Sequence, residues 1–367
     1  MRILMSTDTV GGVWTFSQEL TSGLIEQGHD VALISLGRMP NPTQQAWAAS
    51  MQYEWGSRFE YQPLDCPLEW MQDNSAAFDL AALVLLRAVD VFRADLIHSN
   101  QFCFGALATS VPKLITAHSD VLSWADACRP EGLGASDWLT CYRSLVQAGL
   151  DGCNAVVAPT QWMLQALGSH FTLPANTHVI SNGRSIERTQ PRERQLRAVT
   201  AGRIWDEAKN VKLLAAVDSP VPICIAGNTL HESNVFDSFD GNVELCGPLC
   251  EQELLALFQT SAIYVCTSEY EPFGLAPLEA ALCGCAVLAN DLPSLREVWE
   301  DSALYFNDAA SLSALLRELA DDPLRLAHAQ GRSMEHAHGY TRRRMTDAYL
   351  ALFSQTVARA QELSDVA

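Results

Sequence analysis

Positive charge is scarce in this chain of 367 residues. Lys and Arg number 24 against 43 Asp and Glu, which gives a formal net charge of −19 at pH 7. Such a chain repels the phosphates of nucleic acids and of anionic membranes unless its basic residues are gathered locally. We therefore expect no nucleic-acid partner, and contact with a membrane is possible but not favoured.

Long hydrophobic runs are absent as well. No stretch approaches the roughly 18 consecutive apolar residues that a membrane-spanning helix needs. The first residues, MRILMSTDTVGG, hold one short apolar run broken by Thr7 and Asp8, without the apolar core or cleavage site of a signal peptide. The eleven cysteines are odd in number and scattered, which favours reduced thiols. These features together predict a cytoplasmic protein.

What the chain does contain is a regular alternation of short apolar runs, typical of strands, with longer segments of helical periodicity such as Val13–Gln27 and Ala77–Val91. The strands expected in the first half are Arg2–Met5, Val31–Leu36, Leu96–His98, Leu114–Ala117 and Ala155–Ala158. The pattern then restarts, with strands expected at Ala198–Ala201, Val221–Ala226, Val243–Cys246, Ile263–Cys266 and Ala286–Ala289. This alternation predicts parallel βαβ units in two doubly wound domains.

An irregular, weakly apolar stretch around Pro191 separates the two halves, and we place a hinge there. At about 150 residues per domain the length also fits two domains. The domain boundaries that we expect are an N-terminal domain at 1–183, a hinge at 184–197, a C-terminal domain at 198–342 and a final helix at 343–367 that packs back on the N-terminal domain.

The strongest functional signal follows the strand expected at Ile263–Cys266. Glu271 lies on a loop and Glu279 on the next helix, with seven residues between them. Open α/β sheets bind ligands at the carboxyl ends of their strands. The backbone N–H groups of Phe273-Gly274-Leu275, at the helix start, suit a phosphate or sugar oxygen. Two carboxylates beside such a site can bind sugar hydroxyls or stabilise a developing positive charge.

A weaker signal is the glycine pair Gly11-Gly12, which follows the first strand and opens a helix. Adjacent glycines let a ligand approach the backbone closely, and a helix N-terminus favours an anion. The pair is not a complete GxGxxG, and no Lys-Ser/Thr follows it, which argues against a P-loop.

In this order the motifs resemble those of the retaining glycosyltransferases of family 4, over nearly the whole chain. Glu271 and Glu279 match the family's E-x7-E motif, and Gly11-Gly12 matches its N-terminal glycine loop. Gly202-Arg203 followed by Lys209 is similar to the Arg and Lys that hold the donor pyrophosphate. The resemblance implies the α/β GT-B fold: two facing Rossmann-like domains with doubly wound parallel sheets, closed by a C-terminal helix.

The resemblance also implies roles for these residues. The C-terminal domain would bind the nucleotide-sugar and the N-terminal domain the acceptor. Arg203 and Lys209 would neutralise the pyrophosphate. Glu271 would contact the donor sugar, and Glu279 the ribose. His118 resembles the histidine after the family's fourth N-terminal strand and would steady the donor sugar or the acceptor, unless it is only structural. Donor contacts through the backbone are expected at Gly11, Gly12, Gly247, Pro248, Leu249, Phe273, Gly274 and Leu275.

The chain departs from the family pattern around Lys209. Asn210 stands where the family usually has Gly, and five residues separate Arg203 from Lys209 where four are common. This spacing leaves open a shift of the pyrophosphate clamp by one residue.

The activity that the resemblance implies is retaining hexosyl transfer from a nucleotide-sugar, with the chemistry in the cleft between the domains. UDP-glucose is the donor expected on base rates alone, and the acceptor is an unidentified small molecule or glycan. We expect that acceptor to be soluble, because Val13–Gln27 has no Lys or Arg for docking on an acidic membrane. No Asp-x-Asp pair follows a strand, so we expect no metal and no cofactor beyond the nucleotide-sugar co-substrate. The oligomeric state is open.

Two alternatives remain at this point. A GT-B nucleotide-sugar epimerase would share the architecture and convert the donor without an acceptor. A non-catalytic nucleotide-sugar-binding protein is the other alternative, and the paired glutamates and the Arg-Lys clamp argue against it.

Overall fold

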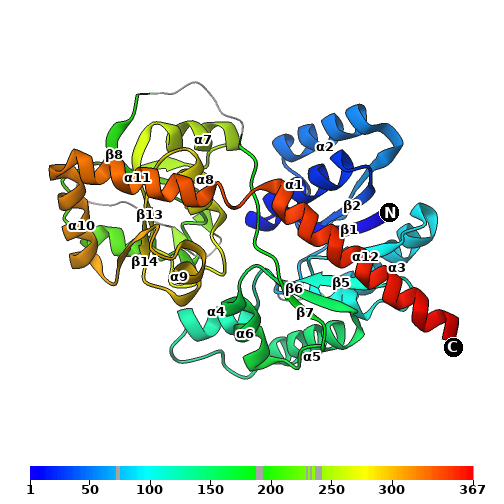
Figure 1. The fold of residues 1–367 in the computed structure, drawn as a ribbon. Helices are drawn as coiled ribbons and strands as arrows, with labels where there is room; N and C mark the ends of the chain where they lie inside the picture. Colours follow the sequence, from blue (N-terminus) through cyan, green and yellow to red (C-terminus); the bar gives the residue numbers. More distant parts are fainter. Residues whose placement is uncertain (72–74, 187–192, 229, 232–233, 236–241, 367) are drawn as a thin grey trace. The chain divides into compact units, whose positions relative to one another are not determined.

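The computed structural model describes residues 1–71, 75–186, 193–228, 230–231, 234–235 and 242–366. These residues form two compact units (Figure 1). Unit 1 comprises Met1–Ala125, Glu131–Gly183 and Arg342–Ala367, and unit 2 comprises Asp126–Pro130 and Arg184–Thr341. Part of the hinge expected at 184–197, residues 187–192, lies outside the described residues.

A seven-stranded parallel sheet forms the centre of unit 1, in the order β3-β2-β1-β4-β5-β6-β7. Since β1 lies between β2 and β4, the strand order reverses at β1, which is where doubly wound sheets bind ligands. The strands are β1 (Arg2–Asp8), β2 (Asp30–Leu36), β3 (Phe59–Pro63), β4 (Leu96–Ser99), β5 (Lys113–Thr116), β6 (Ala155–Ala158) and β7 (Thr177–Val179).

Helices surround this sheet, and the last helix of the chain returns to it. They are α1 (Gly12–Glu26), α2 (Pro42–Trp55), α3 (Ser75–Phe92), α4 (Val121–Cys128), α5 (Asp137–Gly152), α6 (Gln161–His170) and α12 (Arg342–Val366), with 3-10 turns η1 (Gly56–Arg58) and η2 (Phe102–Ala106). Helix α12 packs against α1 through the buried core, where Phe16 of α1 contacts Tyr349 with ring centroids 5.7 Å apart. The two helices lie so close together that a Cβ added at Gly23 would be 2.2 Å from Thr346 Oγ1.

Unit 2 contains a six-stranded parallel sheet in the order β12-β9-β8-β13-β14-β15, and its strand order reverses between β8 and β13. The strands are β8 (Gln195–Ala201), β9 (Ile223–Ala226), β12 (Val243–Gly247), β13 (Ser261–Cys266), β14 (Ala286–Asn290) and β15 (Leu304–Phe306), with a separate antiparallel pair β10 (Leu230–His231) and β11 (Asn234–Val235). The helices and turns are η3 (Glu207–Lys209), η4 (Val211–Ala216), α7 (Glu251–Gln259), α8 (Leu275–Leu282), α9 (Pro293–Trp299), α10 (Ala309–Asp321) and α11 (Pro323–Ala337).

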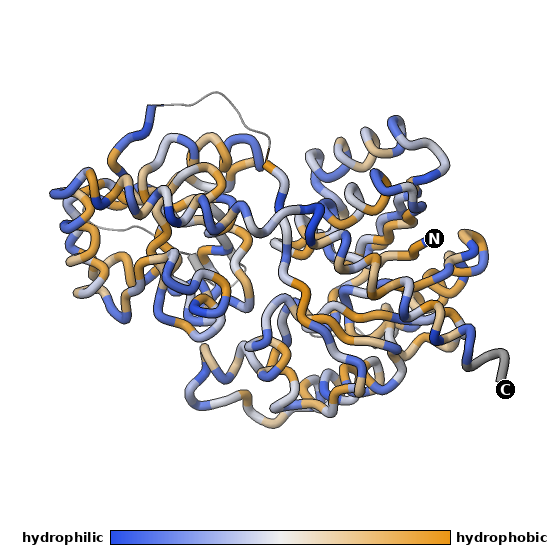
Figure 2. The backbone as a smooth tube through the Cα atoms, viewed as in Figure 1, coloured by the Kyte–Doolittle hydropathy of each residue, from blue (hydrophilic) through white to orange (hydrophobic). Residues whose placement is uncertain are grey.

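Both faces of the unit 2 sheet are covered. Along β13, Ile263 and Val265 belong to one apolar cluster, while Tyr264 and Cys266 belong to another. A strand buried on two faces reads as a continuous apolar run, which is why the sequence pattern identified it. Figure 2 shows hydrophobic residues along the strands of each unit and hydrophilic residues mainly at loops and helix surfaces.

The fold class expected from the sequence is confirmed, because both units are built on doubly wound parallel sheets. All ten strands expected from the pattern are present, but the short pair β10–β11 and, in the two parallel sheets, β3, β7 and β15 were missed. Each of these three lies at the edge of its sheet, where partial exposure breaks the apolar run. As a consequence His118 follows the fifth strand of unit 1, not the fourth as the sequence indicated.

None of the helices in the described part of the chain combines the length and the hydropathy that crossing a bilayer requires.

Candidate functional site

Loops after β8 and β13 meet at the carboxyl ends of these neighbouring strands in unit 2. The strand order reverses here, so loops far apart in the sequence leave the sheet side by side. A small hollow lies between them, lined among others by Thr200, Gly202, Lys209, Tyr264, Thr267 and Ser268. This hollow is the centre of the candidate site in unit 2.

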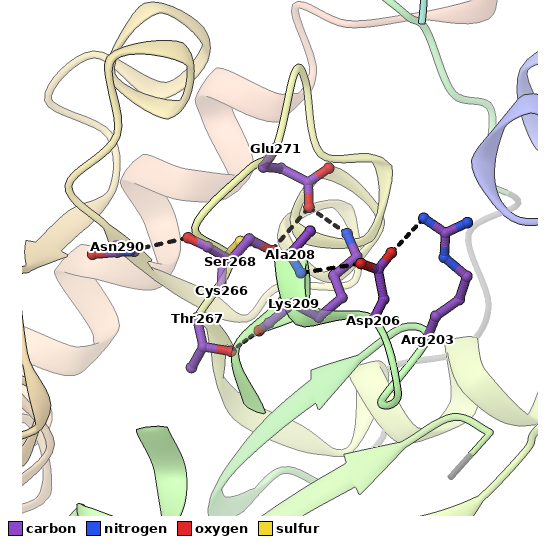
Figure 3. Close-up of polar contacts among 9 residues, drawn as sticks. All are labelled: Arg203, Asp206, Ala208, Lys209, Cys266, Thr267, Ser268, Glu271 and Asn290. Carbon is purple, nitrogen blue, oxygen red and sulfur yellow. Dashed lines mark hydrogen bonds and ion pairs between the residues drawn. The ribbon is translucent and has the colours of Figure 1, made fainter. Parts of the chain in front are cut away.

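An ion pair joins Lys209 to Glu271 at this hollow. Lys209 Nζ lies 2.5 Å from Glu271 Oε2, and the two side chains are 24% and 13% exposed (Figure 3). Ser268 Oγ donates a hydrogen bond of 3.1 Å to the same carboxylate oxygen. Burial alone would lower the pKa of Lys209, but the charge and hydrogen bond of Glu271 outweigh it and raise the pKa of the ammonium. Lys209 is therefore a fixed positive charge at neutral pH.

The turn that carries Lys209 is held on both sides. Asp206 caps η3, because its Oδ1 accepts a hydrogen bond of 3.0 Å from the backbone N–H of Ala208. The loop after β13 holds the other side, where Thr267 Oγ1 donates to the Lys209 carbonyl at 2.6 Å and the Glu269 N–H donates to the Ala208 carbonyl at 2.8 Å. The ammonium is thus aimed by backbone contacts.

Asn210 has the left-handed backbone conformation, with φ 42° and ψ 38°. Glycine favours this conformation, and Asn is among the few side chains that tolerate it. Asn210 Nδ2 also donates a hydrogen bond of 2.8 Å to Glu269 Oε1. The departure from glycine therefore preserves the turn, and Lys209 itself, not a neighbouring residue, reaches Glu271.

Arg203 lies on the same loop, on the other side of Asp206 from Glu271 (Figure 3). Its guanidinium binds Asp206 Oδ2 at 2.6 Å and lies over the ring of Trp205, 5.5 Å from the ring centre. The side chain is 41% exposed. Asp206 therefore links the two expected clamp residues, since it binds Arg203 and caps the turn that carries Lys209.

Glu279 lies in α8 and pairs with a different cation. Arg184 Nε lies 2.8 Å from Glu279 Oε1, and the two side chains are 7% and 12% exposed. The Arg184 guanidinium also pairs with Glu251, the first residue of α7. Sequence reasoning missed Arg184 and Glu251, because nothing in local spacing indicates a contact across 95 residues. The only available signal was the excess of arginine after residue 183.

The backbone that precedes α8 turns at Gly274. Gly274 is the N-cap of α8 in the left-handed region, with φ 90° and ψ 80°, and Leu275 opens the helix. Phe273 is buried and packs its ring against Tyr340, with centroids 5.6 Å apart. The free N–H groups of the first helical turn are thereby held in a fixed place.

Glycines allow close backbone approach next to the hollow. A Cβ on Gly227 would lie 1.8 Å from the carbonyl oxygen of Gly202, so the loops after β8 and β9 touch through their backbones. The Gly227 N–H donates to the Gly247 carbonyl at 2.8 Å, and Gly247 has a φ of 69°. Pro248 and Leu249 follow Gly247 at the carboxyl end of β12, two strands away from β8.

The remaining expected residues belong to unit 1. Gly11 is the N-cap of α1 with φ 71°, and Gly12 is the first residue of that helix. His118 Nε2 lies 2.8 Å from Asn100 Oδ1, and its ring centre is 4.5 Å from that of Phe16. Burial lowers the pKa of His118 to about 3, so this imidazole is neutral near pH 7. Asn100 in turn donates to the Ser6 carbonyl at 2.6 Å.

Within unit 2 the structure thus brings Arg203, Lys209 and Glu271 together, and within unit 1 it places Gly11-Gly12 and His118 at the carboxyl ends of β1 and β5. Across the described ranges, no three His, Cys, Asp or Glu side chains are grouped so that they could hold a metal ion.

Family models match two consecutive parts of the chain. Residues 10–188 match Glycosyltransferase Family 4, and residues 185–336 match Glycosyl transferases group 1. The two matches overlap at residues 185–188, directly after Gly183 and Arg184, where unit 1 passes into unit 2.

Curated relatives match over very different lengths. The chain is 36% identical to the serotype-specific mannosyltransferase WbdA of Escherichia coli over 78 residues, which is 21% of this chain but only 10% of that protein. It is 26% identical to alpha-maltose-1-phosphate synthase of Mycobacterium tuberculosis over 291 residues, covering 68% of this chain and 73% of the synthase.

Solved structures match over nearly the whole chain. Sucrose-phosphate synthase from Thermosynechococcus elongatus has a TM-score of 0.76 at 16% identity, covering 98% of this chain and all of the other. Anabaena HepE in complex with UDP and glucose has a TM-score of 0.73 at 16% identity, with coverage of 96% and 99%. At such low identity these matches establish the fold alone.

Proposed function

The chain belongs to the glycosyltransferases of family 4 type with the GT-B fold, and from this membership we propose that it transfers a hexose from a nucleotide-sugar to an acceptor, with retention of anomeric configuration. The observation that carries the proposal is the Lys209–Glu271 ion pair at the carboxyl ends of β8 and β13. A fixed cation beside a carboxylate at this edge supports the proposal, because doubly wound sheets bind ligands at the carboxyl ends of their strands.

In the proposed reaction the donor's bond between its anomeric carbon and the diphosphate oxygen breaks. A bond to the acceptor's hydroxyl oxygen forms on the same face of the sugar, and the proton of that hydroxyl passes to the leaving diphosphate. Negative charge grows on the leaving group as the bond breaks. Lys209 and Arg203 would stabilise this charge, together with the N-terminus of α8.

The roles proposed for the two glutamates are those that the family resemblance implies. Glu271 would accept hydrogen bonds from the donor sugar while it keeps Lys209 in place, and Glu279 would bind the ribose. The backbone at Phe273-Gly274-Leu275 would hold the phosphate, and that at Gly247-Pro248-Leu249 the base. We propose that Arg and Lys replace a divalent metal at the pyrophosphate, so that transfer persists in EDTA.

UDP-glucose is the first donor to test, and a soluble acceptor is proposed. HepE structures with UDP-glucose support the choice of donor, whereas mannosyltransferases among the curated relatives argue for including other nucleotides. The donor screen therefore covers UDP, GDP, ADP and their hexose conjugates.

A thermal-shift measurement with that screen tests the proposal. A ligand at 100 times its dissociation constant stabilises a protein by about 2.7 kcal/mol, which is a visible shift. We expect stabilisation by one nucleotide and its loss in Arg203→Ala. Arg317→Ala is the matched control, because Arg317 is an exposed arginine of unit 2 that also pairs with an aspartate, Asp218. Stabilisation by none of these nucleotides would refute the donor site.

Incubation of the stabilising nucleotide-sugar with and without an acceptor panel then distinguishes a transferase from an epimerase and from a binding protein. Sugar transfer that requires an acceptor supports the proposal. Conversion of the donor to an isomer without acceptor would establish an epimerase, and tight binding without turnover would establish a binding protein.

A further inference from the structure

Arg184 is a buried cation that the proposed reaction leaves without a role. Arg184 is only 8% exposed, although it is the first residue of the hinge expected at 184–197. The Arg184 N–H donates to the Tyr340 carbonyl at 3.0 Å, and Arg184 forms a bridge with Thr341. Arg184 and Thr341 are the first and last residues of the main segment of unit 2, so the backbone fixes Arg184 where the two ends of this segment meet.

The side chain of Arg184 connects two helices at the candidate site. Its Nε donates to Glu279 Oε1 of α8 at 2.8 Å, and another nitrogen pairs with Glu251 at the start of α7. A guanidinium, with its planar fork of donors, is suited to binding two carboxylates at once. Glu251 is 47% exposed, whereas Glu279 is 12% exposed. The buried end of the link therefore lies in α8, the helix that begins directly after the loop of Glu271.

Arg184 acts on the buried carboxylate of Glu279 in two ways: it compensates the negative charge, and it fixes the side-chain rotamer. An unpaired charge at 12% exposure is costly, and the Arg184 cation offsets the loss of water. A glutamate side chain also has several rotamers, of which the Nε–Oε1 contact selects one. A carboxylate accepts several hydrogen bonds at once, so the contact with Arg184 is compatible with hydroxyl donors from a ligand.

From this geometry we infer that Arg184 is a positioning residue, which orients Glu279 for the ribose hydroxyls of the nucleotide. The inference rests on the proposed function, because it presupposes that a nucleotide binds beside α8. A positioning role and a merely structural role of Arg184 predict different results. If Arg184 positions Glu279, its loss weakens recognition of the ribose specifically. If Arg184 were only structural, its loss would weaken nucleotide binding in general.

Titration calorimetry with UDP and 2′-deoxyUDP, and with the matching ribose and 2′-deoxy forms of GDP and ADP in parallel, tests this inference on the whole protein. For the nucleotide that binds, we expect the wild type to favour the ribose form by about tenfold, the value of one good charge-assisted hydrogen bond. Arg184→Met weakens binding of the ribose form by a similar factor and leaves the 2′-deoxy form nearly unchanged, so that the ratio of affinities falls toward one.

Unit 1 contains a matched control. Arg342 also links two glutamates, the buried Glu19, 3% exposed, and the exposed Glu26, 53% exposed. Arg342→Met therefore removes the same kind of link far from Glu279 in the chain. We expect a lower Tm with an unchanged ratio of affinities for the ribose and 2′-deoxy forms.

A double-mutant cycle shows whether Arg184 acts through Glu279. If it does, Arg184→Met reduces affinity less than twofold further once Glu279→Gln is present. Full additivity of the two losses would overturn the inference. If Arg184→Met does not fold, Arg184→Gln, which keeps a polar side chain and removes the charge, replaces it with the same expected ratio.

The two proposals fail differently. A wild-type protein that binds none of UDP, GDP and ADP refutes the proposed function, and the inference with it. A wild type that binds and an Arg184 variant that keeps the full preference for ribose refute the inference alone.

Discussion

Lys209 and Glu271 are 62 residues apart in the sequence, and their charged atoms are 2.5 Å apart in the structure. The pairing is possible because β8 and β13 are neighbours at the point where the strand order of unit 2 reverses. Ser268 reinforces it from the β13 side, and the capped turn after Asp206 reinforces it from the β8 side. Lys209 and Glu271 thus form an arrangement that is supported from both loops.

Removal of the Lys209 charge should reduce sugar transfer at least about tenfold, because one charge-assisted contact to the leaving group is worth this much. The variant is Lys209→Met, measured by kcat/KM with the donor that the screen identifies. Lys212→Met serves as the control, since Lys212 is exposed on the following turn. Equal activity of the two variants would exclude Lys209 from the reaction.

The left-handed conformation of Asn210 predicts opposite results for two substitutions. Asn210→Gly should keep the turn and most of the activity, because glycine adopts a φ of 42° without strain. Asn210→Val should cost about 1–2 kcal/mol of stability and misplace Lys209. Urea unfolding and transfer assays of the pair test this expectation. An active, stable Asn210→Val would contradict it.

Close packing of α1 on α12 predicts a steric conflict at Gly23. A Cβ there would lie 2.2 Å from Thr346 Oγ1, so Gly23→Ala should lower the free energy of unfolding by about 1–3 kcal/mol. Thr346 Oγ1 is buried without a hydrogen-bond partner among the described residues, and Thr346→Ala alone should change little. The double variant should recover part of the loss. If the losses of stability in the two single variants simply add in the double variant, a Cβ at residue 23 does not clash with Thr346.

Acid should destabilise the protein through His98. Burial, followed by the charge of His118, lowers the pKa of His98 from 6.5 to about 3. Between these pH values His98 is protonated in the unfolded chain but not in the folded protein. The free energy of unfolding therefore falls as the pH falls from about 6.5.

His98→Phe keeps a ring among Phe16, Tyr349 and Phe353 but cannot titrate. Its loss of stability between pH 7 and pH 5, followed by urea unfolding, should be smaller than that of the wild type. His328→Asn, at an exposed position, is the control and should match the wild type. An equal pH slope for His98→Phe would assign the acid sensitivity to other groups.

The sequence pattern identified the central strands and missed the edge strands. In both cases the reason is burial, which determines how continuously apolar a strand is. Ile263–Cys266 is buried on both faces and therefore reads as a strand by composition alone. Phe59–Pro63 alternates exposed residues with buried or half-buried ones at the edge of its sheet and includes a proline, so its signal was too weak. The strand count before His118 was wrong by one as a result.

The sequence by itself determined the fold class, the family, and the order of the motifs along the chain, since apolar periodicity and motif spacing are local properties that report burial and loop chemistry directly. It placed Glu271 on a loop and Glu279 on the helix that follows. Only the tertiary structure decided which cation each glutamate meets, Lys209 in one case and Arg184 in the other. These partners depend on strand order and on where distant loops leave the sheet, and no local spacing encodes either.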